Sequence, residues 1–182
     1  MNKVVIDQAT KRVDVYIDHL KVPLNCPVCN LQCTVYDHLK ERVWRDRDSI
    51  DFVTYVHSDP PRISCRIHGI IQVTIPWSER LSRFTTRFET HAIEVLQSTD
   101  VKKASSILGI TWNEGWHIMD KAVKRGLSRK TWNPLVIGVD EKSYGKHHNY
   151  VTMVYNLIEP AVEYVSFNRK KASLNSYYIL IG

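Results

Sequence analysis

Four residues of this sequence have the spacing of metal ligands. Cys26 and Cys29 form the motif CPVC, and Cys65 and His68 form the motif CRIH, which is followed by Gly69. A two-residue spacer places two ligand atoms on one tight turn, where both can reach one tetrahedral zinc ion at about 2.3 Å. The pattern predicts a structural Zn²⁺ site with a Cys3His ligand set.

Two alternatives stay open for these residues. Free cysteines are often simple core residues, and Cys33 is the alternative to His68 as the fourth ligand. Paired two-residue spacers favour zinc, and a chain without an apolar signal segment favours a reducing compartment, in which metal sites are commoner than disulfides. The remaining histidines of this part lack such partners and are expected to be surface or satisfied residues: His19, His38, His57 and His91.

A single carboxylate, Asp140, follows the apolar segment VIGV (136–139). An aspartate at the end of a strand is usually a surface residue, and the alternative is a hard oxygen ligand for Mg²⁺. Phosphodiester chemistry with two metal ions needs several carboxylates to hold the cations about 4 Å apart. Glu141 is adjacent, so in a strand it lies on the opposite face and cannot serve as the second carboxylate.

Strands are expected around both the Cys3His set and Asp140. Segments 47–58 (RDSIDFVTYVHS) and 70–77 (IIQVTIPW) have the composition and alternation of strands and predict a zinc ribbon. After Pro134, a buried strand ending at Asp140 and two further strands, over 149–159 and 161–171, predict an antiparallel meander. Its first turn is GKHH (145–148), and a helix follows in ASLNSYYIL (172–180).

Helical elements are expected between these two regions. The spacing of apolar residues predicts an amphipathic helix over 83–98. A short helix over 101–108 should begin after an N-cap at Asp100 and end at Gly109. The next helix opens at Thr111, which forms a capping box with Glu114 three residues later.

Two helices joined by a short turn containing glycine are typical of a helix-turn-helix that binds DNA. The chain carries a net charge of +6, and residues 100–130 hold seven basic against three acidic side chains. The alternative is a helical hairpin with a solvated basic face, and Gly115 argues slightly against a recognition helix because glycine costs about 1 kcal/mol relative to alanine. In the DNA-binding interpretation, the residues near the bases are Thr111, Asn113, Glu114 and His117, and the basic groups are Lys102, Lys103, Lys121, Lys124 and Arg125.

Length and composition agree with these modules. A chain of 182 residues with 43% hydrophobic residues can form one domain plus smaller modules. No stretch approaches the roughly 20 apolar residues of a membrane span, so we expect a cytoplasmic protein without membrane contact.

The order of the motifs resembles the insertion-sequence transposases that have an N-terminal zinc finger, a helix-turn-helix and a DDE catalytic domain of the RNase H-like fold. The resemblance covers essentially the whole chain and rests on CPVC, YDHLKERVWRDRD, CRIHG, TIPW, SRFT, ILGITWNEGWHIMDKAVKRGL and IGVDEKSYGKHHNYVTMVYNL, followed by NRKKASL.

The resemblance implies an α+β chain with a zinc-finger module (1–78), a helix-turn-helix domain (79–131) and the first three strands of an RNase H-like domain (132–182). It matches Cys26, Cys29, Cys65 and His68 to the zinc ligands, Ser105 and Gly109 to the small residue and turn glycine, and Asp140 to the first catalytic aspartate that binds Mg²⁺. The implied partner is double-stranded DNA, at the terminal inverted repeats of the mobile element.

The family's other two catalytic carboxylates lie downstream of the segment RKKASL, and the sequence ends at Gly182. We therefore expect a C-terminally truncated copy that binds DNA without cleaving it and associates with itself through the open edge of an incomplete sheet. An intact nuclease would have to cleave DNA in a metal-dependent way. A zinc-containing helix-turn-helix transcriptional regulator is the alternative function.

Overall fold

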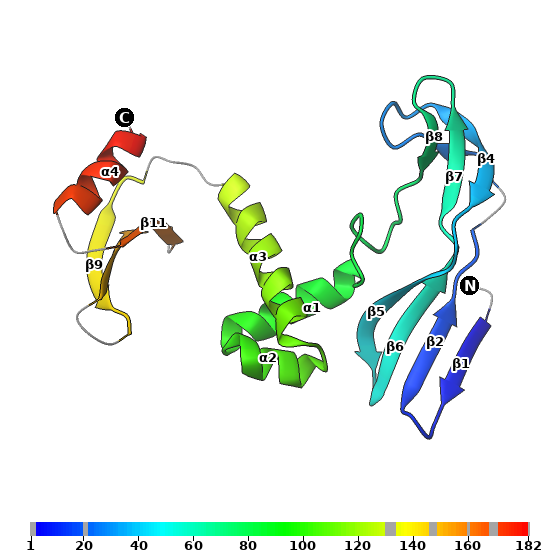
Figure 1. Ribbon diagram of the computed structural model, residues 1–182, viewed down its shortest axis with the longest axis horizontal. Helices are drawn as coiled ribbons and strands as arrows, with labels where there is room; N and C mark the ends of the chain where they lie inside the picture. Colours follow the sequence, from blue (N-terminus) through cyan, green and yellow to red (C-terminus); the bar gives the residue numbers. More distant parts are fainter. Residues whose placement is uncertain are drawn as a thin grey trace. The chain divides into compact units, whose positions relative to one another are not determined.

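The computed structural model describes residues 3–19, 22–129, 134–145, 149–159, 161–167 and 171–181 (Figure 1). The chain divides into two compact units, Met1–Val123 and Lys124–Gly182. The first unit contains two four-stranded sheets and most of three helices, and the second contains a three-stranded sheet and one helix. The expected α+β class is confirmed at this level. In the described parts, no helix is both long and apolar enough to cross a membrane.

The first sheet of unit 1 has the order β1-β2-β6-β5. Its strands are β1 (Lys3–Asp7), β2 (Arg12–Tyr16), β5 (Arg42–Ser49) and β6 (Phe52–Ser58). Strands β2 and β6 run parallel and the other neighbours run antiparallel. The prediction of one strand over 47–58 is wrong, because the chain turns at Ile50, which has φ 60° and is 93% exposed.

A buried histidine stabilises the parallel pair of this sheet. The Nε2 atom of His57, on β6, lies 2.6 Å from Asp14 Oδ1 on β2. Its Nδ1 atom lies 3.1 Å from Glu41 Oε1. Tyr16 stacks on its ring at 4.5 Å. His57 is therefore a satisfied histidine, as expected, but its partners come from segments distant in sequence.

The second sheet of unit 1 consists of two hairpins in the order β3-β4-β7-β8. Strands β3 (Leu24–Asn25) and β4 (Gln32–His38) form one hairpin, and β7 (Pro61–Cys65) and β8 (Gly69–Gln72) form the other. Antiparallel pairing of β4 with β7 joins them around fully buried Ile63. The strand predicted over 70–77 ends at Gln72, so only its first part is correct.

The helices of unit 1 are α1 (Thr86–Ser98), α2 (Val101–Leu108) and α3 (Trp112–Ser128). Asp100 accepts the N–H of Lys103 as the N-cap of α2, and Gly109 ends α2 in the left-handed conformation with φ 64°. Thr111 and Glu114 exchange hydrogen bonds as a capping box. These three predictions are confirmed, because capping depends on residues close together in sequence.

Helix α1 is attached to the first sheet by backbone hydrogen bonds. Arg45 on β5 donates its N–H to Arg83 O and accepts from Thr85 N, at 2.8 and 3.0 Å. The Thr85 hydroxyl also donates to Asp46 at 2.6 Å. Behind this attachment the three helices share one apolar core, formed by Phe84, Phe88, Ala92, Leu108 and Ile118.

Unit 2 contains the predicted antiparallel meander and helix. Strands β9 (Ile137–Ser143), β10 (Tyr150–Asn156) and β11 (Ala161–Phe167) have the order β11-β10-β9, and α4 (Lys171–Ile181) follows. Three predictions lie partly outside the described residues. They are the GKHH turn, the end of the third predicted strand and the domain boundary at 131/132.

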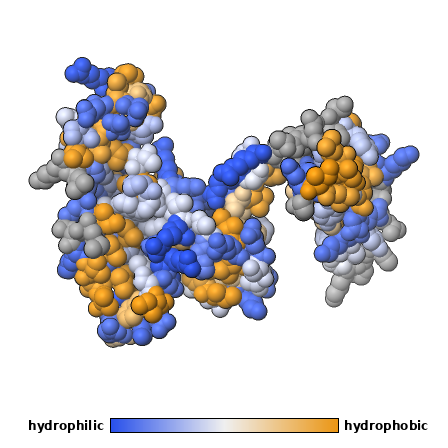
Figure 2. Space-filling model, turned by 180° about the vertical axis from the view of Figure 1, so that it is seen from behind, coloured by the Kyte–Doolittle hydropathy of each residue, from blue (hydrophilic) through white to orange (hydrophobic). Residues whose placement is uncertain are grey.

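The expectation that the first strand of the meander is the buried one is wrong. Strand β9 lies at an edge and is exposed from Val139 onward, whereas β10 lies in the centre and contains fully buried Val154. Asp140 also lies in the middle of β9 rather than at its end. Apolar side chains remain exposed on this unit, among them Val165 at 52% and Phe167 at 70%, and Figure 2 shows hydrophobic side chains gathered on its visible surface.

Candidate metal centre and nucleic-acid interface

The two hairpins of the second sheet bring four potential metal ligands together. Cys26 and Cys29 lie in the β3–β4 turn, and Cys65 and His68 lie at the β7–β8 turn. One ligand atom of each residue falls within 4.8 Å of all the others. Because β4 pairs with β7, two turns that are about 40 residues apart in sequence meet at the same end of the sheet.

The separations of these atoms suit a tetrahedral ion. Cys29 Sγ lies 3.6 Å from Cys65 Sγ, and His68 Nδ1 lies 3.6 Å from Cys26 Sγ and 3.7 Å from Cys65 Sγ. A tetrahedral zinc ion with ordinary bond lengths would separate two sulfurs by about 3.8 Å and a sulfur from a nitrogen by about 3.6 Å. Three of the six separations therefore match a tetrahedral site, and the group could bind a metal ion.

Backbone N–H groups favour the thiolate form that a metal requires. Those of His68 and Ile67 lower the pKa of Cys65 to about 6. The N–H of Cys29 likewise lowers the pKa of Cys26. The thiolate of Cys65 in turn raises the pKa of His68. Although the N–H of Leu31 opposes it, burial and the neighbouring thiols raise the pKa of Cys29 instead, so the arrangement favours the thiolate at Cys65 and Cys26 only.

Cys33 is placed differently from the other three cysteines. It shares the apolar core of this sheet with Cys26 and Cys65, but it lies on strand β4 rather than in a turn, and its thiol donates to Leu31 O at 3.3 Å. Burial raises the pKa of this thiol, which disfavours the thiolate. The structure therefore groups His68, rather than Cys33, with the other three ligands.

Helix α3 lies against α2 at an unusually close contact. A Cβ atom added at Gly115 would lie 2.4 Å from Ser105 Oγ on α2. Both residues are buried. Gly115 is thus explained by the packing of the two helices, and its low helix propensity does not argue against the helix-turn-helix.

The residues expected near DNA bases divide into two groups. The side chains of Asn113 and His117 are exposed on the first turns of α3. Thr111 and Glu114 instead bond to each other at 2.8 Å and cap the helix. Asn113 and His117 therefore remain as the candidates for base contact, whereas Thr111 and Glu114 position the helix.

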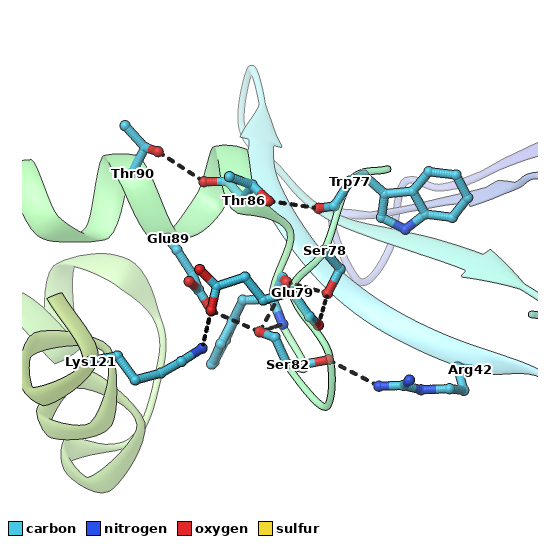
Figure 3. A network of polar contacts seen from close by, with 10 residues as sticks. Arg42, Trp77, Ser78, Glu79, Ser82, Thr86, Glu89, Thr90 and Lys121 are labelled. Atoms are coloured by element: carbon cyan, nitrogen blue, oxygen red, sulfur yellow. Dashed lines mark hydrogen bonds and ion pairs between the residues drawn. The ribbon is translucent and has the colours of Figure 1, made fainter. Parts of the chain in front are cut away.

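Lys121 has an internal role. Its Nζ lies 3.0 Å from Glu79 and 3.3 Å from Glu89, which is buried on α1 (Figure 3). Glu89 also accepts the hydroxyl of Ser82 at 2.7 Å, so one carboxylate connects α3, α1 and the loop before α1. Although burial opposes it, the hydrogen bond to Glu79 raises the pKa of Lys121. Because two carboxylates compensate its charge, Lys121 is not among the phosphate contacts that we propose.

The other predicted basic residues lie at the surface of α2 and α3. Lys102 and Lys103 are exposed in the first turn of α2, and Lys124 is exposed on α3, where Arg125 is partly buried.

A feature that the sequence analysis did not identify lies on helix α3. Trp112 and Trp116 stack on each other, 49% and 48% exposed. The i, i+4 spacing of the two tryptophans was the available signal.

Asp140 belongs to no group of three or more potential metal ligands in the described part of the chain. It is exposed on β9, pairs with Met153 on β10 and accepts the N–H of Glu141 at 2.8 Å. Among the described residues, the Cys3His set is the only potential metal group with three or more ligands. The structure therefore tests the position of Asp140 but not its binding of Mg²⁺.

Comparison with known proteins finds similarity in the helical region and along most of the chain. Residues 73–123 match the helix-turn-helix domain of transposase family ISL3. The chain is 23% identical over 165 residues to the transposase for insertion sequence element IS1557 in two strains of Mycobacterium tuberculosis, which covers 86% of this chain and 36% of those proteins. It is 22% identical over 174 residues to the transposase for insertion sequence element IS1001 of Bordetella parapertussis, which covers 92% of this chain and 42% of that protein.

The chain thus spans less than half of the length of these curated relatives. No solved structure is significantly similar to it. The matched segment contains all of α1 and α2 and the first two thirds of α3, including Gly115 and the exposed Asn113 and His117. Residues 73–123 are therefore similar to the helix-turn-helix domain of transposase family ISL3, within a chain that is similar over most of its length to insertion-sequence transposases.

Proposed function

We propose that this chain is the DNA-binding part of an insertion-sequence transposase and binds the terminal inverted repeats of its element through α3. One observation carries the proposal: within the matched domain, the capping box and the Gly115 contact fix a helix whose first turns present exposed Asn113 and His117. A helix in the major groove contacts base edges with such residues.

Basic side chains around α3 would bind the DNA backbone. Lys102 and Lys103 at the start of α2, with Lys124 and Arg125 on α3, are our proposed phosphate contacts. Lysine and arginine contribute mainly to affinity and its salt dependence, whereas Asn113 and His117 would provide sequence preference.

We also propose that the Cys3His group binds Zn²⁺ and makes residues 1–78 a zinc-ribbon module. The two paired hairpins and the near-tetrahedral separations support this assignment. Four protein ligands leave no coordination position for a substrate, so the ion would be structural and would contribute to folding.

Residues 132–182 are our candidate for the start of an RNase H-like domain after the helix-turn-helix domain of 79–131. Three antiparallel strands followed by a helix support this. Asp140 would be one Mg²⁺ ligand, and Glu141 on the opposite face would not be another. Because a cation pair needs several carboxylates, Asp140 would not support strand cleavage without further acidic ligands.

Fluorescence anisotropy with labelled duplexes tests the proposed function. The probes are a duplex with the terminal inverted repeat of the encoding element and a shuffled duplex of the same composition. We expect tighter binding to the repeat and an affinity that falls as salt rises. The double variant Asn113→Ala/His117→Ala should lose most of the preference and keep the salt-dependent binding to both duplexes.

Equal binding of the wild-type protein to both duplexes would remove the inverted-repeat assignment. A preference for promoter DNA of a neighbouring operon would favour a transcriptional regulator instead. The variant Tyr36→Ala is a control for general effects of substitution. The side chain of Tyr36 is exposed on β4, in the second sheet of unit 1, so this variant should bind as the wild type does.

A further inference from the structure

We propose that Trp112 and Trp116 form an apolar surface that contacts thymine methyl groups in the major groove. The inference rests on the proposed function, that α3 binds DNA, and extends it to a class of base contact. It assigns a role in sequence preference to two residues that neither cap α3 nor belong to its core.

The two indole rings form one exposed unit. Their centroids are 5.4 Å apart and their planes differ by 12°, and the side chains are 49% and 48% exposed. Each ring covers one face of the other and leaves the outer edges of the pair in water. Tryptophan commonly contributes much of its contact energy through burial, so two half-exposed rings side by side suggest a contact site.

The position of Trp116 on α3 directs it toward the same surface as the polar candidates, and Trp112 supports it by stacking from the preceding turn. At about 100° per residue, Trp116 lies about 60° around the helix from Asn113. The core-facing residues of this part of α3 are Gly115 and Ile118, and Trp112 and Trp116 are not among the buried residues. A helix that places Asn113 and His117 in the major groove therefore brings Trp116 to the base edges as well.

The chemistry of the surrounding surface favours DNA over a protein partner. The polar side chains of Asn113 and His117 are exposed on the same turns of α3, where they would interrupt a continuous apolar surface of the kind that packs against another helix. The C5-methyl group of thymine is the apolar group that base edges present in the major groove. An indole edge beside asparagine and histidine thus matches a groove surface in which thymine methyls lie next to hydrogen-bonding groups.

Replacement of thymine by uracil tests this inference, because it removes only the methyl group. The probes are the terminal inverted-repeat duplex and the same duplex with all thymines replaced by uracil, each measured by anisotropy with the wild-type protein and with Trp112→Ala/Trp116→Ala. For the wild type we expect affinity to fall about fourfold for each methyl group that the rings cover. The variant should bind the two duplexes with nearly equal affinity.

The ratio of the two affinities is measured within one protein, so a general loss of stability in the variant does not imitate the expected result. Trp116→Phe keeps an aromatic contact and should retain part of the preference for the thymine duplex. Tyr36→Ala should retain all of that preference. Equal binding of the wild type to both duplexes would overturn the inference and leave the proposed function standing. No binding of the wild type to the thymine duplex would refute the proposed function and this inference with it.

A second copy of the chain is the competing occupant of this surface. Sedimentation of the wild type and the double tryptophan variant distinguishes the two. Two results together would overturn the DNA contact and assign the rings to self-association. The wild type would form a dimer that the variant cannot form, and it would bind the thymine and uracil duplexes with about equal affinity.

Discussion

The contact between Gly115 and Ser105 predicts that one substitution has opposite effects at two places on α3. Gly126 is also in α3, but a Cβ atom added there meets nothing within 4 Å. Gly126→Ala should therefore stabilise the helix by about 1 kcal/mol through helix propensity alone. Gly115→Ala gains the same amount, but its new Cβ would lie 2.4 Å from Ser105 Oγ.

The expected cost at Gly115 follows from this overlap. Extra atoms in a packed interface typically cost about 1–3 kcal/mol, so Gly115→Ala should be less stable than Gly126→Ala by about that amount. Ser105 Oγ is buried without a hydrogen-bond partner among the described residues, so Ser105→Ala removes the obstacle at little cost. In that background the nearest side-chain atom to the new Cβ is Val101 Cγ1 at 3.5 Å, and Gly115→Ala should now stabilise.

Urea unfolding followed by far-ultraviolet circular dichroism measures the three single variants and the double variant. The double-mutant cycle should give a coupling of about 1–3 kcal/mol between Gly115 and Ser105. If Gly115→Ala and Gly126→Ala stabilised equally, rotation of the Ser105 hydroxyl would have relieved the overlap, and the argument that this contact demands glycine would be refuted.

The remaining predictions concern the ion pair, the metal group and Asp140. Lys121→Ala should lower the free energy of unfolding by about 1–3 kcal/mol, because Glu89 loses a partner. It should leave the slope of log DNA affinity against log salt concentration unchanged, and a shallower slope would show that Lys121 contacts phosphate. Cys65→Ser should abolish the one bound zinc ion per chain that mass spectrometry is expected to find, whereas Cys33→Ser should retain it, and the reverse result would exchange their roles. The purified 182-residue chain should not cleave DNA with Mg²⁺, and cleavage that Asp140→Ala removes would contradict this.

Local signals predicted the elements well where the decisive residues are neighbours in sequence. Asp100, Gly109 and the Thr111–Glu114 box set helix boundaries within a few residues, because a cap satisfies backbone groups of its own first or last turn. The β9–β10–β11 meander was also predicted, because short connections join strands that follow each other. The β2–β6 pairing was missed, since parallel neighbours are far apart in sequence.

The candidate site shows the same division. The sequence by itself determined that Cys26 with Cys29 and Cys65 with His68 could each reach one ion, since a two-residue spacer is a local constraint. Only the tertiary structure decided that the two pairs meet and that Cys33 lies in the core, because the β4–β7 pairing sets both positions.

On α3 the sequence determined the helix and its basic charge, because composition and capping are visible in a single segment. The fold decided which charges remain at the surface and why glycine occupies position 115. Lys121 is compensated by Glu79 and Glu89, and Gly115 meets Ser105, through contacts with elements that lie 10 to 42 residues earlier in the sequence. Such contacts depend on how helices and loops pack, which spacing along the chain does not specify.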